Sequence, residues 1–145
     1  MKVRFKKLSP KAVTPSYATP GDAGMDVTAI GHRIDAKHNF IEYHTGLALE
    51  IPEGYVGLLF PRSSVSKMDV SLANCVGVVD SGYRGEITFR YKFAKDSFFA
   101  GVKRYNDGDR IGQLVIIPYP SIELEEADEL NETVRGEGGY GSTGK

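Results

Sequence analysis

The chain has 145 residues, of which 41% are hydrophobic and 26% charged, and its formal net charge is −1. This length is that of one domain with one core, and the composition excludes a disordered chain. A charge so close to zero also argues against a polybasic protein that binds long DNA or RNA.

Neither a membrane span nor a disulfide framework is expected. No stretch approaches the length of roughly 20 apolar residues that crosses a bilayer, and residues 1–7 are basic without the apolar run of a signal peptide. Cys75 is the only cysteine and stands in an apolar run, which excludes an intramolecular disulfide and a multi-cysteine zinc site. We therefore expect a soluble protein in a reducing, cytoplasmic setting, either that of its own cell or that of a host.

Short β signals recur along the chain, and helical periodicity is almost absent. Residues 9–24 contain three prolines and predict a loop. After this loop, apolar or alternating runs of four to eight residues are bounded by Gly, Pro, Asn or Asp, which is typical of strands. The predicted strands span residues 40–44, 47–51, 55–60, 70–73, 76–79, 86–93 and 111–118. This number of short strands predicts a sandwich, a barrel or a jelly roll.

One strand and one helix have distinctive patterns. In residues 87–93, four apolar or aromatic side chains alternate with three polar ones, which predicts one buried face and one polar face. Residues 62–68 lack this alternation and carry serines suited to capping. They predict a helix of one or two turns.

Two segments in the first half of the chain carry polar residues that a plain β-sandwich does not need. Residues 23–29 place Asp26 in a strand-like stretch, where a charge needs a partner, either an arginine or a hydrated cation. Residues 61–64 place Arg62, Ser63 and Ser64 at a helix start, where free backbone amides favour anions. A simple serine cap is the alternative there.

Two further segments follow. Residues 77–85 place Asp80 and Tyr83 at the tip between two apolar strands, where an ordinary hairpin turn also accounts for Asp, Ser and Gly. A fixed aspartate, ionised at neutral pH, can orient and deprotonate a water. Residues 108–113 place Gln113 near the start of an apolar strand, where its amide needs a partner, which a backbone group would satisfy equally well.

The last segment, residues 135–145, contains five glycines together with arginine, lysine and two adjacent hydroxyls. Glycines let backbone amides approach anionic oxygens, so the segment predicts a phosphate wrap, with a disordered tail as the alternative. Residues 139–145 also spell the start of a P-loop. We reject that match, because a P-loop joins a buried strand to a helix and the sequence stops at Lys145.

In this order, the five segments resemble the five motifs of the trimeric deoxyuridine triphosphate nucleotidohydrolase (dUTPase) family, over nearly the whole chain. The similar stretches are residues 23–26, 61–64, 74–85, 109–113 and 135–144. The resemblance implies an all-β subunit with a distorted jelly-roll (β-clip) fold and one short helix, in a homotrimer with its sites between subunits. Residues 1–134 would form the jelly-roll domain, and residues 135–145 a glycine-rich flap lent to a neighbouring subunit.

The family resemblance also implies an activity. It is the hydrolysis of dUTP to dUMP and pyrophosphate with Mg²⁺, which limits uracil incorporation into DNA and supplies dUMP for dTMP synthesis. The ion would be bound mainly through the triphosphate and water, with Asp26 near its hydration shell or in an arginine network and no protein group as a direct ligand. This agrees with the three histidines, His32, His38 and His44, which lack the spacing of a zinc site. The expected partners are dUTP and two further copies of the chain, with no nucleic acid and no membrane.

The resemblance assigns a role to each site residue. Asp80 would be the base that directs water to the α-phosphorus, Tyr83 would pack under the deoxyribose, and Asn74 would bind the uracil edge. The tight hairpin backbone around Asn74 would exclude other bases. The other substrate-binding residues would be Arg62, Ser63, Ser64 and Gln113 at the phosphates, Gly77 and Val79 in the hairpin, and Arg135, Tyr140, Gly141, Ser142 and Thr143 in the flap.

Tyr140 departs from the family pattern, because the flap usually carries Phe at this place. Stacking on uracil should survive, since the phenol keeps its π-face. Two alternatives remain open. A dCTP deaminase of the same fold characteristically uses a glutamate near the base and would release ammonia from dCTP. A non-catalytic jelly-roll module would release no pyrophosphate and would be indifferent to Asp80→Asn.

Overall fold

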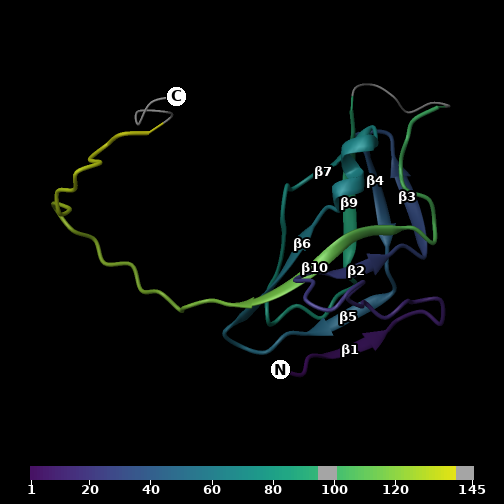
Figure 1. Ribbon diagram of the computed structural model, residues 1–145, viewed down its shortest axis with the longest axis horizontal. Helices are drawn as coiled ribbons and strands as arrows, with labels where there is room; N and C mark the ends of the chain where they lie inside the picture. The colour runs from purple at the N-terminus through teal and green to yellow at the C-terminus, as the bar shows by residue number, and fades with distance from the viewer. Residues whose placement is uncertain (95–100, 140–145) are drawn as a thin grey trace.

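A computed structural model describes residues 1–94 and 101–139, which form an almost entirely β structure (Figure 1). One four-stranded antiparallel sheet has the order β2 (Met25–Thr28), β10 (Arg110–Pro118), β6 (Tyr55–Phe60) and β8 (Gly77–Val79). The other has the order β3 (Gly31–Asp35), β4 (Phe40–His44), β9 (Thr88–Phe93) and β7 (Val70–Leu72). Strands β1 (Arg4–Lys7) and β5 (Leu47–Glu50) form a two-stranded sheet.

The hydrophobic core joins residues of both four-stranded sheets. In β9, the alternation predicted from sequence is confirmed: Phe89, Tyr91 and Phe93 are buried, whereas Arg90 and Lys92 are exposed. These aromatic rings lie in one cluster with side chains of the other sheet, namely Val27, Leu59, Val79, Ile111 and Leu114. Two sheets around one core, with almost no helix, confirm the predicted distorted jelly roll.

All seven predicted strands occur, with ends that shift by at most two residues. Three strands were not among them, namely β1, β2 and β3, and each lies at the edge of its sheet. β1 is exposed at every position, and β3 has exposed residues at its three central positions. Charged or exposed side chains are common on edge strands, and they hide the hydrophobic pattern that predicts a strand.

The predicted helix is a short 3₁₀ helix, η1 (Ser63–Lys67). Its N-cap is Arg62, and no side chain of the described residues makes a capping hydrogen bond there, so the predicted serine cap is wrong. Ser66 Oγ instead donates to the carbonyl of Ser63. The predicted loop at residues 9–24 is confirmed, since this fully described stretch has only an isolated bridge between Ser16 and Asp26.

The predicted hairpin between β8 and β9 is wrong. β8 pairs with β6 in one sheet, whereas β9 pairs with β4 and β7 in the other. The turn that Tyr83 closes by donating its amide to the carbonyl of Asp80 therefore begins a crossing between the two sheets. β7 and β8 also belong to different sheets, so the segment around Asn74 is a second crossing and not a tight hairpin.

Gly112 on β10 is required by the close approach of the Phe89 ring. A Cβ at position 112 would lie 2.1 Å from the nearest ring carbon, and Phe89 is 1% exposed. We expect Gly112→Ala to lower the free energy of unfolding by about 1–3 kcal/mol, because the packed ring has little room to move. Urea denaturation checks this against Gly31→Ala, where an added Cβ meets nothing within 4 Å. Equal stability of the two variants would contradict the packing argument.

Beyond β10 the chain leaves the two sheets. Residues 119–139, here called the arm, run away from the body (Figure 1). Tyr119 still donates its amide to the carbonyl of Gly54, but Leu124 is 90% exposed and Leu130 88%. The apolar side chains of the arm thus gain little burial within one chain. Among residues 1–94 and 101–139, no helix has the length and hydropathy to span a bilayer.

Candidate active site

Asp26 on β2 holds two arginines from different segments. Arg62 Nε, just after β6, donates to Oδ1 at 2.7 Å, and Arg110 Nη1, at the start of β10, donates to Oδ2 at 2.8 Å. The Asp26 side chain is 15% exposed. Of the two partners expected for this carboxylate, an arginine or a hydrated cation, the structure shows arginine, and both carboxylate oxygens accept from a guanidinium group. We call Asp26, Arg62 and Arg110 the arginine corner.

Gln113 lies beside the arginine corner because of the sheet register. It is the partner of Asp26 on β2 and of Phe60 on β6. Its Nε2 donates to the carbonyl of Pro61 at 3.1 Å, so the backbone partner considered from sequence is present. A side-chain amide has two N–H groups, and the second of them can donate to a ligand.

The two serines predicted at the phosphates lie on η1, directly after Arg62. Ser63 is exposed, and Ser64 is half-buried with its Oγ 3.1 Å from the hydroxyl of Tyr105. The structure therefore places two predicted site residues, Arg62 and Gln113, beside Asp26, and Ser63 and Ser64 directly follow Arg62 on η1. Two guanidinium groups, two hydroxyls and an amide at one end of a sheet can bind a polyanion.

Asp80 and Tyr83 lie at the other end of this sheet. Antiparallel pairing places Gly57 opposite Val79, so Asp80 follows β8 beside the start of β6. Arg62 follows the end of β6, which spans six residues. At a rise of about 3.3 Å per residue, the two ends of β6 are roughly 15–20 Å apart. A single chain therefore does not bring Asp80 next to the arginine corner.

The local geometry around Asp80 leaves its carboxylate at the surface. Asp80 is exposed, and Tyr83 is 47% exposed, with its hydroxyl donating to the carbonyl of Glu86 at 3.1 Å. The tyrosine ring folds back over Gly85, where a Cβ would lie 2.3 Å from the tyrosine oxygen. Glycine at position 85 thus allows this ring orientation.

Asn74, Gly77 and Val79 lie along an edge of the structure. β8 is the last strand of its sheet among the described strands, so one of its backbone edges faces outward. Val79 is buried, and Gly77 packs close to Leu59, so both can offer a ligand only their backbone groups. Asn74 is exposed and lines a cavity of about 360 Å³ together with Gly77. Next to it, Cys75 is exposed at a φ of 59°.

The flap is only partly described. Arg135 is exposed at the far end of the arm, where its Nε donates to the carbonyl of Gly138 at 2.9 Å. Figure 1 shows this end of the arm far from both parts of the site. The remaining predicted flap residues, Tyr140, Gly141, Ser142 and Thr143, lie outside the described residues.

Two residues of this region were not predicted as site residues. Arg110 stands in one of the five segments, at the start of the strand that carries Gln113. Its charge at that place could have identified it as a site residue. Tyr105 precedes that segment and belongs to no sequence pattern. Its contact with Ser64 joins residues 41 positions apart, which only the fold reveals.

The fold and the arginine corner define an all-β domain in which one carboxylate pairs with two guanidinium groups at one end of a sheet. The family model of dUTPase matches residues 10–144, and the chain belongs to the dUTPase family. A deoxyuridine 5'-triphosphate nucleotidohydrolase of Picosynechococcus sp. is 38% identical over 145 residues, which cover 99% of each chain. The protein of that name from Thermobifida fusca is 37% identical over 145 residues, 99% of this chain and 79% of its own.

Solved structures agree with this assignment. A mutant dUTPase of Staphylococcus bacteriophage 80alpha with dUpNHpp superposes with a TM-score of 0.79 at 28% identity, over 99% of each chain. A mutant dUTPase of phage phi11 of S. aureus, described with a structural Mg(II) ion, gives a TM-score of 0.71 at 27% identity. That match covers 89% of this chain and 98% of the phage protein.

Proposed function

We propose that the chain hydrolyses dUTP to dUMP and pyrophosphate. The observation that carries this proposal is the arginine corner with Gln113 beside it, because its guanidinium and amide groups are donors suited to phosphates and lie in segments that resemble the family's motifs. The names of the relatives and the dUpNHpp in the phage 80alpha structure support the choice of nucleotide. We place the reaction in the cytoplasm, where it would limit uracil incorporation into DNA and supply dUMP for dTMP synthesis.

The site is proposed to lie between the subunits of a homotrimer. Asp80 and the arginine corner are at opposite ends of β6, so one nucleotide contacts both only if they come from different subunits. A further subunit lends residues 135–145. The exposed Leu124 and Leu130 of the arm support this arrangement, because apolar side chains so exposed in one chain gain stability from a partner surface.

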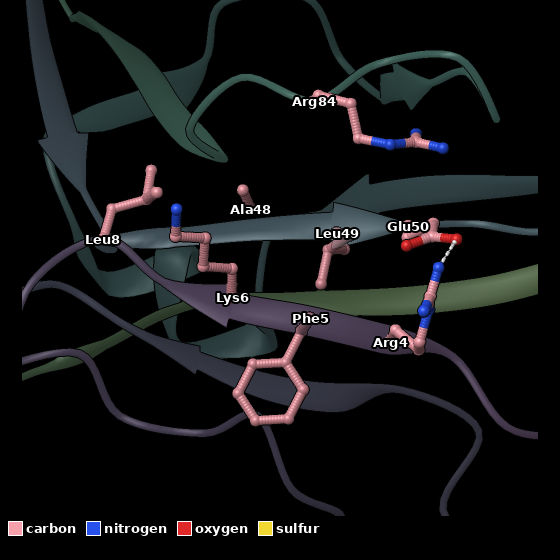
Figure 2. A pocket seen from close by; sticks show the side chains of 8 residues that line it. All are labelled: Arg4, Phe5, Lys6, Leu8, Ala48, Leu49, Glu50 and Arg84. Carbon is pink, nitrogen blue, oxygen red and sulfur yellow. Dashed lines mark hydrogen bonds and ion pairs between the residues drawn. The ribbon is translucent and has the colours of Figure 1, made fainter.

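The surface of β1 offers such a partner surface for the arm of a neighbour. Among the described strands β1 pairs only with β5, which leaves its other edge open. Arg4, Lys6 and Arg84 line a cavity of about 510 Å³. Figure 2 shows these side chains, with Arg4 paired to Glu50. The arm is rich in acidic residues, namely Glu123, Glu125, Glu126, Asp128, Glu129, Glu132 and Glu137. This charge complementarity supports an arm that docks on a neighbouring subunit.

The reaction begins with the Asp80 carboxylate accepting a proton from water as the water oxygen bonds to the α-phosphorus. The bond to the bridging oxygen breaks, and pyrophosphate leaves with dUMP as the second product. Tyr83 packs under the deoxyribose and leaves no room for a ribose 2′-hydroxyl. Asn74 binds the uracil edge, and the backbones of Gly77 and Val79 line the base.

The phosphates are bound by positively charged arginines and by neutral hydrogen-bond donors. Arg62, Ser63, Ser64 and Gln113 donate to phosphate oxygens, and Arg135 meets the γ-phosphate when the flap closes. In the rest of the flap, Tyr140 stacks on uracil while Gly141, Ser142 and Thr143 wrap the phosphates. Closure excludes water other than the attacking one and fixes the triphosphate for attack.

Magnesium is proposed to reach the site on the triphosphate. Both carboxylate oxygens of Asp26 accept from arginines, so the donor set of the corner fits the phosphates of a metal-bound nucleotide. Within the described residues there is also no group of three or more His, Cys, Asp or Glu arranged to hold a metal. The ion would neutralise charge on the phosphates, and no direct protein ligand is proposed.

A nucleotide panel tests the proposal. The protein is incubated with dUTP, UTP, dTTP or dCTP and Mg²⁺, and both pyrophosphate and ammonia are measured. We expect pyrophosphate from dUTP, and far less from the other three nucleotides. Ammonia from dCTP would support the deaminase alternative, and no product from any nucleotide would support the non-catalytic module. Comparable cleavage of UTP would remove Tyr83 from its role at the sugar.

A further inference from the structure

Tyr105 is a buried tyrosine whose hydroxyl reaches the short helix η1. It is 2% exposed and lies in the irregular segment that leads into β10. Its oxygen is 3.1 Å from Ser64 Oγ. The contact connects η1, which carries Ser64, with the segment before β10, which carries Gln113, and both side chains are proposed to bind the phosphates.

The position of Tyr105 is fixed by two other buried tyrosines. Its ring makes edge contacts with Tyr43, at a centroid distance of 6.2 Å, and with Tyr91, at 5.7 Å. Its carbonyl accepts a hydrogen bond from the Tyr43 hydroxyl at 2.8 Å, and the Tyr91 hydroxyl donates to Ile111 at 2.5 Å. Burial raises the pKa of Tyr43 to about 12, so this hydroxyl remains a donor at neutral pH.

The helix that carries Ser64 has few other anchors. None of its five residues, all of them described, is buried, and its N-cap residue Arg62 makes no capping bond with its side chain, which pairs with Asp26 instead. Val65 is partly buried against the core, and among the described residues Ser66 Oγ bonds only to the carbonyl of Ser63 in the same helix turn. A fixed phenol at 3.1 Å from Ser64 is therefore well placed to set the position of that side chain.

We propose that Tyr105 is a positioning residue for the triphosphate and acts through Ser64. A hydroxyl has one proton and two lone pairs, so Ser64 can accept from Tyr105 and still donate to a phosphate oxygen. Such a chain of hydrogen bonds polarises each member and strengthens the terminal donor. This inference rests on the proposed function in one respect, namely that Ser64 contacts the phosphates.

Tyr105→Phe tests the inference, because it keeps the ring and removes only the hydroxyl. Affinity for dUpNHpp is measured by calorimetry for the wild type, Tyr105→Phe, Ser64→Ala and the double variant. We expect about a fivefold to tenfold loss of affinity for Tyr105→Phe, the usual size for one such hydrogen bond. The double variant should bind no more weakly than Ser64→Ala alone, since both changes break the same chain of bonds.

Tyr91→Phe is the matched control. It removes the hydroxyl of a neighbouring buried tyrosine that bonds to the Ile111 carbonyl. We expect it to lower thermal stability at least as much as Tyr105→Phe and to leave affinity for dUpNHpp unchanged. A merely structural role of Tyr105 would give the same result for both variants and would overturn the inference.

Other outcomes are equally decisive. Additive losses of affinity in the double variant would overturn the inference. Full affinity for dUpNHpp in Ser64→Ala would also overturn it, and this measurement does not require that Tyr105→Phe folds. Cleavage of dUTP by the wild type is measured in parallel. A wild type that binds dUpNHpp with the expected Tyr105 dependence but does not cleave dUTP would refute the proposed hydrolysis alone and support the positioning role.

Discussion

Replacing Asp80 with asparagine is expected to lower kcat for dUTP by about three orders of magnitude and to leave the affinity for dUpNHpp nearly unchanged. Asparagine has the shape of aspartate but does not accept a proton at neutral pH, and a positioned base contributes about 10²–10⁴-fold to a rate. Asp80 is exposed after the end of β8, so thermal stability should not change. Steady-state kinetics and calorimetry separate the two effects.

Glu53→Gln is the control for this substitution. Glu53 is an exposed carboxylate that lines the same surface cavity as Ser81, the residue after Asp80. It has no proposed role in the reaction, so its kcat should match the wild type. Wild-type turnover by Asp80→Asn would contradict the role of Asp80 as the base, whereas a non-catalytic module would show no turnover in the wild type or in either variant.

Deletion of residues 135–145 is expected to leave a folded protein with at least about 100-fold lower kcat/KM for dUTP, the cost of losing the groups that fix a substrate for attack. Within the described part of the chain, residues 135–139 make their hydrogen bonds inside the arm, Arg135 with Gly138 and Gly136 with Thr133. Removal of these bonds does not touch the core. Thermal melting of the truncated chain checks that it folds, and dUTP kinetics check the loss of kcat/KM. Full activity of the truncated chain would refute the proposed role of the flap.

A mixture of the two inactive variants tests whether base and flap come from different subunits. Subunits of Asp80→Asn and of the truncated chain are unfolded together and refolded. In a homotrimer with random assembly, about a quarter of the sites would then combine an intact Asp80 with an intact flap from another subunit. Activity should return to that fraction. No recovery would mean that both groups come from one chain.

The strands were predictable where the pattern is local. In β9 the alternation of Phe89, Arg90 and Tyr91 predicts which side chains are buried without any knowledge of the neighbouring strands. β1 has the sequence Arg-Phe-Lys-Lys and is exposed throughout, so its pairing with β5 leaves no hydrophobic pattern in the sequence. The crossing after Asp80 was predicted as a hairpin because Asp, Ser and Gly suit a turn in either case. Sheet membership depends on partners distant in sequence.

The site was predictable in its residue types more than in its geometry. The need of Asp26 for a cationic partner follows from its place in a strand, but the choice of both Arg62 and Arg110 follows from the order β2-β10-β6. The separation of Asp80 from the arginine corner along β6 is likewise a property of the sheet, and the order of the motifs in the sequence does not predict it. Roles for the flap residues remain predictions.

The most direct test of the account is the fate of a labelled oxygen. Hydrolysis of dUTP in water enriched in a heavy oxygen isotope is followed by mass spectrometry of both products. Attack on the α-phosphorus places the label in dUMP, and we expect one labelled oxygen there with none in pyrophosphate. Label in pyrophosphate, with unlabelled dUMP, would show attack on the β-phosphorus and would contradict the role of Asp80 proposed here.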